Sequence, residues 1–312
     1  MLPDSELVLV ADIGGTNTRV ALGDTTGGLH GLRVLKNTDI DDLQTLLEET
    51  IGAGRRRTTS AVLALAGPVD GDEVRLTNHP WTISRSIFEN ALGLRRLILV
   101  NDFLAVAHAM PVLKERDVIE IQKGEAAGPG NILVCGPGTG FGAAALIDSG
   151  ATKTGITSEA GHMLLGATSK EESELFSRIS FQRGPIVVED VLSGAGLVSL
   201  YRALSQEALA SEEIIASAQT DNIDARKAIA VFMKVFGRIV GALALAYNAL
   251  GGVYIVGGIG RALAPIYVHS GFIESFCNHP PYADRLRRVP LSVVTHDQPG
   301  LVGALQIGIS AL

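Results

Sequence analysis

Residues 7–22 read LVLVADIGGTNTRVAL and carry the strongest structural signal of the chain. An apolar run ends at Asp12, the pair Gly14-Gly15 follows, and apolar character resumes at Val20. Because glycine permits positive φ and close approach of the main chain, this pattern predicts a β-hairpin whose turn points backbone N–H groups at an anion. The alternative is an ordinary hairpin with a tight turn.

The predicted turn differs from the two common phosphate loops. A Walker loop needs GxxxxGK followed by Ser or Thr, and a dinucleotide loop needs GxGxxG at the start of a helix; the stretch has neither. Asp12 offers a carboxylate at the strand end that can orient a water bound to Mg²⁺ beside phosphates, and Thr16, Asn17 and Arg19 add hydrogen-bond donors. The hairpin is therefore a candidate phosphate loop between two strands.

Composition restricts the class of protein. The chain has 312 residues, of which 46% are hydrophobic, so it is long enough for one large bilobal unit or two domains. A net charge of −7 argues against non-specific binding to nucleic acid or acidic lipid. The one basic run, Arg55-Arg56-Arg57, is interpreted as a solvated helix end. The two cysteines, Cys135 and Cys277, lie far apart in the sequence and do not have the spacing of metal ligands. This use of cysteine is expected in a reducing cytosol, and we assign both residues to packing.

The ends and apolar stretches predict a cytoplasmic protein. The N-terminus lacks the charged and long apolar regions of a signal peptide. The most apolar long stretch, 239–253, is shorter than the roughly 20 residues that a membrane span requires and contains Asn248, so we expect a buried helix and no membrane partner.

Several elements are expected in the first half beyond the hairpin, from apolar spacing and capping residues. A polar turn over 77–81 either touches the substrate or is simply anchored by Trp81. The expected elements are a strand over 32–35, a helix over 42–51 capped by Asp39 or Asp41, a buried parallel strand over 61–66, a helix over 85–92 capped by Ser84, a buried strand over 97–100 and a helix over 103–110.

Two polar residues, Asn101 and Asp102, directly follow the buried strand over 97–100. Ligands of open α/β sheets collect at the carboxyl ends of strands. An aspartate there can accept a proton from a substrate hydroxyl, and the asparagine can hydrogen-bond a neighbouring hydroxyl. The alternative is that Asp102 only caps the following helix.

The second half repeats the pattern of the first. Residues 133–146 align without gaps on 9–22, with Gly138 in the place of Gly14, and 253–256 ending in Gly257-Gly258 echoes 97–100 ending in Asn101-Asp102. We interpret the chain as a diverged internal duplication. One half then supplies the chemistry and the other, with glycines at its strand ends, makes room for a nucleotide. A dinucleotide loop at 136–140 is the alternative, although a strand is expected to follow it.

Further candidate groups lie in the second half. Glu159 and His162 stand three residues apart on one loop and suit the vicinal hydroxyls of a sugar, whereas a zinc site would need more ligands. Glu189 is expected at a helix end before a glycine turn, and a surface acid is its alternative. The remaining expectations are a long helix over 225–250 in which Gly237 and Gly241 allow close packing, helical structure over 270–289, a strand over 290–294, and a helix over 301–312 that packs on the first lobe.

The motifs together resemble bacterial ATP-dependent glucokinases of the hexokinase and actin-like ATPase superfamily. They come in the family order and span nearly the whole chain: ADIGGTNTRVAL (11–22), LTNHPW (76–81), LVNDF (99–103), GPGTGFG (136–142), SEAGH (158–162), VEDVLSGAGLVSLYRA (188–203), GGVYIVGGI (251–259) and HDQPGLVGA (296–304). The repressor-and-kinase family of sugar kinases matches less well, because its cysteine-rich zinc motif and N-terminal helix-turn-helix are absent. Pro137 and Ala160 depart from the family pattern.

The resemblance implies an α/β fold of two ribonuclease-H-like lobes that face a central cleft. The smaller lobe would hold residues 1–112 and 299–312, with the phosphate hairpin and the catalytic aspartate; the larger, residues 113–298, would bind sugar and adenosine. The implied partners are glucose and ATP with Mg²⁺, in a homodimer. The implied glucose ligands are Asn101, Asp102, Glu159, His162 and Glu189, with Asp102 acting on the 6-hydroxyl. The implied nucleotide ligands are Ala11, Asp12, Ile13, Gly14, Gly15, Thr16, Gly138, Thr139, Gly140, Gly257 and Gly258, with Mg²⁺ held by Asp12 through water.

Two further functions stay open at this stage. One is a kinase for another hexose or with another phosphoryl donor. The other is a non-catalytic actin-like sensor gated by a nucleotide.

Overall fold

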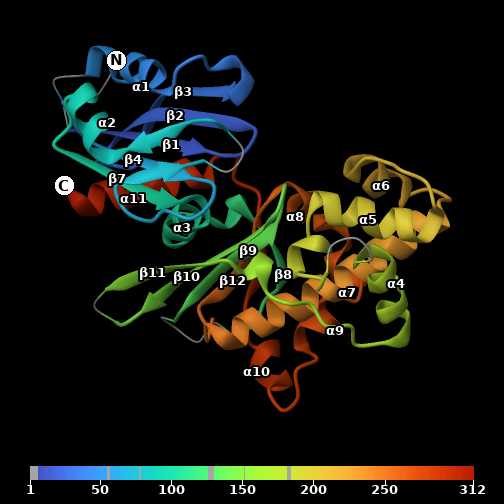
Figure 1. The fold of residues 1–312 in the computed structure, drawn as a ribbon. Coiled ribbons are helices and arrows are strands. Elements are labelled where there is room, and N and C mark those ends of the chain that lie inside the picture. Colours follow the sequence, from blue (N-terminus) through green and yellow to red (C-terminus); the bar gives the residue numbers. More distant parts are fainter. Residues whose placement is uncertain (1–5, 55–56, 77–78, 126–129, 151, 181–183) are drawn as a thin grey trace. The chain divides into compact units, whose positions relative to one another are not determined.

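The computed structural model describes residues 6–54, 57–76, 79–125, 130–150, 152–180 and 184–312. Arg55 and Arg56 of the predicted helix end, and Thr77 and Asn78 of the predicted turn, lie outside the described residues. The chain forms two compact units, the first from residues 1–113 and 296–312 and the second from 114–295 (Figure 1).

The first unit is built on a five-stranded sheet in the order β3-β2-β1-β4-β7. The predicted hairpin is confirmed, because β1 and β2 pair antiparallel, and β1, β4 and β7 run parallel. Alternate residues of β1 point to opposite faces, so Leu9 and Val10 enter different apolar clusters. The strands are β1 (Leu7–Ile13), β2 (Asn17–Asp24), β3 (Leu29–Lys36), β4 (Thr58–Leu65) and β7 (Arg96–Asn101).

Helices cover both faces of this sheet. On one face lie α1 (Leu43–Ile51) and α2 (Arg85–Leu92), and on the other α3 (Asp102–Ala109) and α11 (Pro299–Ala311) (Figure 1). The predicted return of the C-terminal helix to this unit is confirmed. It packs so closely that a Cβ at Gly303 would lie 1.6 Å from the carbonyl oxygen of Ala105 on α3.

The N-cap of α1 differs from the prediction. The N-cap of α1 is Asp42, whose Oδ2 accepts a hydrogen bond of 2.7 Å from Thr45 N, so the prediction of Asp39 or Asp41 was wrong. Asp39 instead ends a short 3₁₀ helix over Asn37–Asp39. A two-stranded ribbon, β5 (Glu73–Arg75) and β6 (Thr82–Ser84), precedes α2. Trp81 packs against the apolar cluster beneath it.

The second unit contains a six-stranded sheet in the order β11-β10-β9-β12-β13-β8. The predicted second hairpin is confirmed, because β9 and β10 pair antiparallel. The strands β8 and β11 were not expected. Both lie at sheet edges, where all their side chains except that of Ile121 are exposed or half-buried, and neither contains a continuous apolar run. The bounds are β8 (Val118–Gln122), β9 (Ile132–Pro137), β10 (Phe141–Asp148), β11 (Lys153–Ser158), β12 (Gly252–Ile255) and β13 (Leu291–Val294).

The strand orders of the two units correspond, which supports an internal duplication, but one predicted equivalence was wrong. In the first unit β4 pairs with β1, and in the second unit β12 pairs with β9 in the same way. The strand β12 is therefore the counterpart of β4. Gly257-Gly258, which follows β12, does not correspond to Asn101-Asp102 at the end of β7. The gapless alignment of the hairpins also fails by one residue: Leu9 pairs with Leu22, whereas Leu133 pairs with Ala145. The second hairpin has the shorter loop.

Helices complete the second unit. The long helix α7 packs on α9, and both predicted glycines are essential to the contact: a Cβ at Gly237 would lie 2.2 Å from Phe272 O, and one at Gly241 2.4 Å from Phe276 O. The bounds are α4 (Lys170–Ser180), α5 (Gly194–Ser205), α6 (Ser211–Ser217), α7 (Ile223–Ala246), α8 (Gly258–Ala262), α9 (Phe272–Cys277) and α10 (Ala283–Arg287).

Two predicted helices proved shorter. The helix expected to reach residue 250 ends at Ala246, because Asn248 adopts a left-handed conformation with φ of 52°. The helical stretch expected over 270–289 is divided into α9 and α10 by Pro280-Pro281, which cannot continue a helix because proline lacks the N–H donor.

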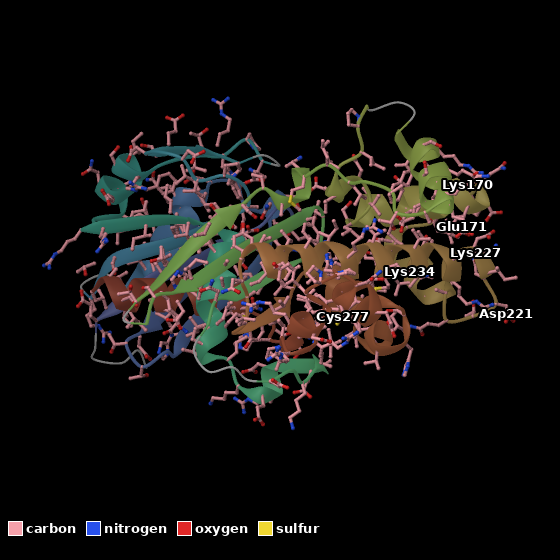
Figure 2. All side chains as sticks on the ribbon, turned by 90° about the horizontal axis from the view of Figure 1, so that it is seen from below. Lys170, Glu171, Asp221, Lys227, Lys234 and Cys277 are labelled. Atoms are coloured by element: carbon pink, nitrogen blue, oxygen red, sulfur yellow. The ribbon has the colours of Figure 1, made fainter. Side chains whose placement is uncertain are left out.

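The apolar helix α7 is long enough to cross a membrane by length and composition, but 67% of its most apolar window is buried inside the structure. It is the core helix that the sequence predicts. Both cysteines pack in this unit, also as predicted, and burial raises the pKa of Cys135 to about 12. In Figure 2 the labelled side chains of Lys170 and Lys227 mark the exposed surface of the same unit.

Candidate active site

The loop of the first hairpin is closed by one backbone hydrogen bond, from Gly14 N to Asn17 O at 3.0 Å. Gly14 does not adopt the positive φ that the sequence suggested. Its role is instead close approach, because a Cβ there would lie 3.3 Å from Asn17 O. The neighbours Ala11 and Ile13 bury their side chains completely, so only their main chain is available to a ligand.

The residue Asn37 supports this loop and was missed in the sequence. Its Nδ2 donates to Gly14 O at 2.8 Å, its Oδ1 accepts from Thr18 Oγ1 at 2.8 Å, and its backbone N donates to Thr16 O at 2.9 Å. The side chain is buried although the preceding strand β3 is largely exposed. A polar residue that follows an exposed strand is normally interpreted as a surface residue, so no sequence pattern identified Asn37.

The Asp12 carboxylate lies at the end of β1 with 16% of its side chain exposed. Burial raises its pKa, and the guanidinium of Arg19, with Nη1 at 3.5 Å from Oδ2, opposes that shift. The buried Nε of Arg19 has no hydrogen-bond partner among the described residues. Gly300, at the start of α11, faces the carboxylate so closely that a Cβ there would lie 2.7 Å from Oδ2. This is a carboxylate that an added cation would stabilise.

Asn101, and not Asp102, is the N-cap of α3, so the capping alternative for the aspartate was wrong. Asn101 Oδ1 accepts from Leu104 N at 3.1 Å, and its Nδ2 donates to Gly67 O at 3.1 Å. Asp102 is the first residue of the helix, and its Oδ1 accepts from Phe103 N at 2.9 Å. The amide of Asn101 therefore fixes the turn on which Asp102 is presented.

The two candidate aspartates, Asp12 and Asp102, lie at the carboxyl ends of parallel strands, Asp12 near the end of β1 and Asp102 directly after β7. In the sheet register, Asp12 of β1 pairs with Ala64 of β4, and Ala64 pairs with Val100 of β7. Asp102 follows Val100 by two residues. Neighbouring strands are about 4.8 Å apart, so β1 and β7 are separated by about 10 Å. Asp12 shares the strand face of Val10, which packs under α3 and α11, and Asp102 begins α3.

In the second unit the two predicted glycine turns are neighbours. Gly138 N donates to Gly140 O at 2.8 Å, and Gly138 O accepts from Gly194 N at the start of α5 at 3.0 Å. Gly257, with φ of 90°, lies against the end of β9, where a Cβ would be 2.3 Å from Pro137 O. Thr139 is exposed at the tip of the hairpin, and Gly258 begins α8. Since β10 follows the turn, the dinucleotide loop is excluded.

Glu189 is tied to this hairpin. Its Oε2 accepts from Phe141 N at 2.8 Å, and Cβ atoms at Gly140 and Gly161 would lie 2.3 Å and 3.2 Å from the same oxygen. It is half-buried, so the surface-acid alternative was wrong, and so was the predicted helix end: Glu189 lies in a 3₁₀ helix over Val188–Asp190, and the glycines that follow begin α5.

Glu159 and His162 are exposed at a 3₁₀ turn over Ala160–His162, closed by a hydrogen bond from His162 N to Glu159 O of 3.0 Å. The chain beyond the turn pairs with the segment that carries Glu189, because Val188 N donates to Met163 O at 2.9 Å. The three predicted sugar ligands of this unit therefore lie on two segments that are joined. Within the described ranges, no group of three His, Cys, Asp or Glu side chains could hold a metal ion.

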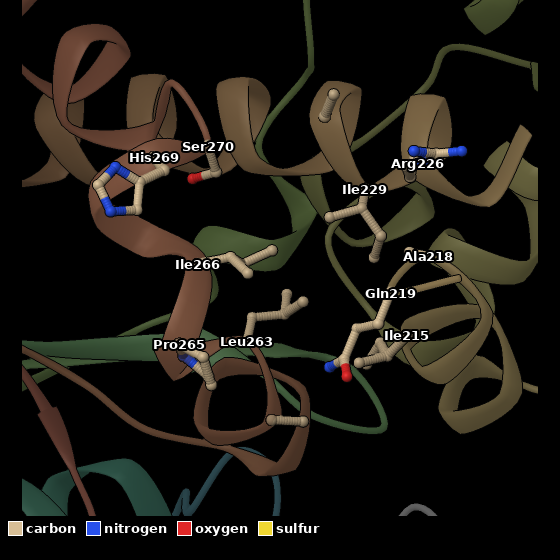
Figure 3. A pocket seen from close by; sticks show the side chains of 12 residues that line it. Ile215, Ala218, Gln219, Arg226, Ile229, Leu263, Pro265, Ile266, His269 and Ser270 are labelled. Atoms are coloured by element: carbon tan, nitrogen blue, oxygen red, sulfur yellow. The ribbon is translucent and has the colours of Figure 1, made fainter. Parts of the chain in front are cut away.

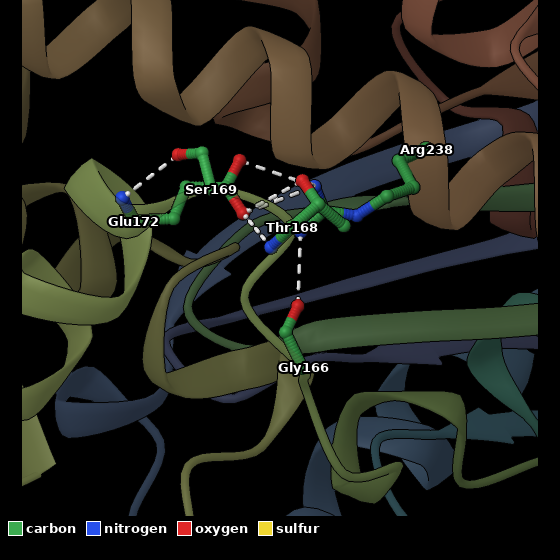
Figure 4. A network of polar contacts seen from close by, with 5 residues as sticks. All are labelled: Gly166, Thr168, Ser169, Glu172 and Arg238. Atoms are coloured by element: carbon green, nitrogen blue, oxygen red, sulfur yellow. Dashed lines mark hydrogen bonds and ion pairs between the residues drawn. The ribbon is translucent and has the colours of Figure 1, made fainter.

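A polar network anchors the same segment to α7 (Figure 4). Arg238 Nη1 lies 3.1 Å from both carboxylate oxygens of Glu172, and its Nη2 donates to Gly166 O at 3.3 Å. Glu172 Oε2 also accepts from Thr168 N at 2.8 Å. Although burial disfavours the charged carboxylate, these hydrogen bonds and the charge of Arg238 leave the pKa of Glu172 below its ordinary value.

A cavity of about 290 Å³ lies beside α8 within the second unit. Figure 3 shows the apolar side chains of Ile229, Leu263 and Ile266 directed toward one another across it, with the amide of Gln219 at its border. Ala262, the last residue of α8, also lines it. A mostly apolar lining with a few polar groups is typical of small-molecule sites.

Comparisons with known proteins agree with this geometry. The family profile described as Glucokinase matches residues 9–309. A glucokinase of Yersinia enterocolitica is 36% identical over 305 residues, which cover 95% of this chain and 94% of that protein. A glucokinase from an Antarctic psychrotroph shares 32% sequence identity with this chain. Its crystal structure superposes with a TM-score of 0.87 over 97% of this chain and 98% of that one. A Balamuthia mandrillaris glucokinase in complex with glucose, 22% identical, has the same fold with a TM-score of 0.81 over 97% and 93% of the two chains.

The fold and the two glycine hairpins define a sugar kinase with the two-lobe actin-like ATPase fold. More narrowly, the chain belongs to the glucokinase family, and its activity is the ATP-dependent phosphorylation of glucose. The alternative of a non-catalytic sensor is set aside.

Proposed function

We propose that Asp102 accepts the proton of the glucose 6-hydroxyl while the γ-phosphoryl group is held at the Asp12 hairpin. The observation that carries this proposal is that Asp12 lies near the end of β1, on the strand face that α3 covers, and that Asp102 begins α3 directly after β7, two strand spacings away. Phosphoryl transfer needs mainly alignment and charge neutralisation, so a carboxylate that orients the hydroxyl and takes its proton late contributes roughly 10²- to 10⁴-fold.

Asp12 fits a Mg²⁺ ion that accompanies ATP. The ion is usually bound through one or two carboxylates, waters and substrate phosphates, and a partly buried carboxylate with a raised pKa gains from a nearby cation. When bound, Mg²⁺ neutralises charge on the transferring phosphoryl group. The Nε of Arg19, which has no partner among the described residues, and the N–H groups of Gly15 and Thr16 are the donors that we assign to phosphate oxygens, because the N–H of Gly14 already closes the loop on Asn17 O.

The predicted sugar ligands are found in each unit taken by itself: Asn101 and Asp102 in the first, and Glu159, His162 and Glu189 in the second. Because the Phe141 N–H fixes the carboxylate of Glu189, that carboxylate would accept a hydrogen bond only from a sugar hydroxyl at one position. A hexose that leaves such a group unpaired loses about 1–3 kcal/mol, which is the basis of discrimination among epimers. If one glucose engages both sets, small-angle scattering will show a smaller radius of gyration with glucose; equal radii count against it.

The adenosine is assigned to the second unit. The turn at Gly257-Gly258 borders it, Gly138 to Gly140 contact the phosphates, and the adenine occupies the cavity of Figure 3. Ala262 is four residues beyond Gly258 on α8, a rise of about 6 Å, which is within the reach of a nucleoside.

We also propose the lobe functions that the family resemblance implies, with the catalytic aspartate in the first unit and adenosine binding in the second, and a cytoplasmic homodimer as the working state. Light scattering coupled to size exclusion tests the dimer; a monomer mass at micromolar protein would contradict it.

The decisive experiment measures glucose 6-phosphate formed from ATP, Mg²⁺ and glucose, with Asp102→Asn beside the parent chain. We expect the variant to lose at least about 10²-fold in kcat while it still binds glucose. Near-normal turnover would exclude the role of Asp102. A panel of other hexoses and donors, including ADP and polyphosphate, tests whether glucose and ATP are the preferred pair.

A further inference from the structure

The buried amide of Asn37 lies beneath the phosphate hairpin, outside every motif described above. We propose that Asn37 is a positioning residue for phosphoryl transfer, which holds the loop from Gly14 to Thr16 in the conformation that binds the phosphates of ATP. The inference rests on the proposed role of that loop and adds a residue that touches neither substrate.

The geometry connects Asn37 to both ends of the loop. Its side chain binds Gly14 O and its backbone N binds Thr16 O, at 2.8 Å and 2.9 Å. Its Oδ1 accepts from Thr18, a fully buried hydroxyl on β2. Asn37 is itself 4% exposed, so water does not compete for these hydrogen bonds.

Chemistry fixes the orientation of the Asn37 amide. Gly14 O can only accept a hydrogen bond, so the amide atom that faces it must be the nitrogen. The oxygen then faces Thr18, whose hydroxyl donates to it. An aspartate at this position would place a carboxylate oxygen against Gly14 O, with repulsion in place of attraction.

The consequence for the ligand follows from the planar trans peptide. The carbonyl of Gly14 and the N–H of Gly15 belong to one peptide group and point in opposite directions. Because Asn37 draws the Gly14 carbonyl toward itself, the N–H of Gly15 points away from Asn37. The same residue holds the Thr16 carbonyl, so two oxygens that would repel phosphate are turned inward.

The test compares Asn37→Ala and Asn37→Asp with the parent chain in steady-state kinetics. We expect Asn37→Ala to raise KM for ATP about tenfold and to lower kcat, with KM for glucose within about twofold, because only the phosphate loop is released. Asn37→Asp should be worse than alanine, since it adds repulsion. Thr18→Val removes one hydrogen bond to Asn37 and keeps the shape of the side chain, so it should raise KM for ATP by less. This variant replaces the Asn37 variants in the test if they fold poorly.

Thr58→Val is the matched control. Thr58 is buried at the opposite end of the sheet and donates to Gly54 O at 3.0 Å, so its loss lowers Tm without touching the loop. An Asn37→Ala variant that loses Tm as Thr58→Val does, with KM for ATP unchanged, would overturn the proposal. Failure of the Asp102 assignment is separable, because it appears as retained kcat in Asp102→Asn and leaves the ATP effect of Asn37 in place.

Discussion

The carboxylate of Asp12 occupies the space that a side chain on Gly300 would need. A Cβ on Gly300 would lie 2.7 Å from Oδ2 and 2.8 Å from Cγ of Asp12, distances that real Cβ atoms do not reach. The start of α11, some 290 residues along the chain, therefore sets where the first carboxylate of the site can point.

Gly300→Ala should displace that carboxylate. We expect kcat to fall at least about tenfold and the Mg²⁺ concentration for half-maximal rate to rise, because the aspartate would no longer face the proposed Mg²⁺ position. Gly308→Ala is the control in the same helix, where the new methyl group meets Val8 Cγ1 at 2.6 Å and disturbs only packing. Equal Mg²⁺ titrations for the two variants would contradict the prediction.

Gly140→Ala should remove Glu189 from its hydrogen bond. The new Cβ would lie 2.3 Å from Glu189 Oε2, so the carboxylate must leave Phe141 N. We expect KM for glucose to rise about tenfold, a cost typical of one misplaced polar group. Gly166→Ala, where no atom lies within 4 Å of the added Cβ, is the matched control. A glucose KM unchanged in Gly140→Ala would show that Glu189 does not bind sugar.

Ala262→Phe tests the adenine assignment by filling the cavity beside α8. An aromatic ring occupies most of the space that a purine would need, so KM for ATP should rise about tenfold or more while KM for glucose stays near the parent value. Ala208→Phe adds the same ring at an exposed site that does not line the cavity. Normal ATP kinetics in Ala262→Phe would place the adenine elsewhere.

Asp24 gives a prediction for the pH dependence of stability. Hydrogen bonds from the Thr26 hydroxyl and from His30, together with the amides of Gly28 and Thr26, hold its pKa well below the ordinary value. A lowered folded-state pKa adds stability that is present above the unfolded pKa of about 3.9 and is lost as the pH falls toward the folded value.

Asp24→Asn should therefore reduce the free energy of unfolding by roughly 2 kcal/mol at pH 7. The difference from the parent chain should shrink as the pH falls below about 4, because the Asp24 carboxylate of the unfolded chain takes up a proton there while that of the folded chain, with its lower pKa, does not. Urea unfolding at several pH values measures this, with the exposed Asp41→Asn as control. A difference that stays constant down to pH 2 would contradict the prediction.

Local patterns predicted the fold where the signal was local. The two hairpins, the buried strand β4 and the glycines of α7 follow from apolar spacing and from turn chemistry within short windows. The strands β8 and β11 show no such signal because they lie at sheet edges, where nearly all their side chains are exposed or half-buried. The counterpart of β12 was misassigned, since strand order depends on pairing between distant segments that spacing cannot report.

The candidate site divides in the same way. Strand ends and glycine turns located Asp12, Asp102 and the second hairpin, because these residues interrupt apolar runs. Asn37 and Gly300 act through three-dimensional contact with residues distant in sequence, and nothing in their immediate neighbours reveals it. The capping role of Asn101 could have been inferred, since an asparagine just before a helix is a standard N-cap.

The first unit is discontinuous, and this has a consequence during synthesis. Residues 296–312 leave the ribosome only after the whole second unit, yet their helix covers the face of the sheet that carries Val8, Val10 and Val62. Until then the nascent sheet exposes an apolar surface, so the half that is translated first is finished last. Chaperone binding to ribosome-stalled chains that end near residue 295 should accordingly exceed binding to the released protein.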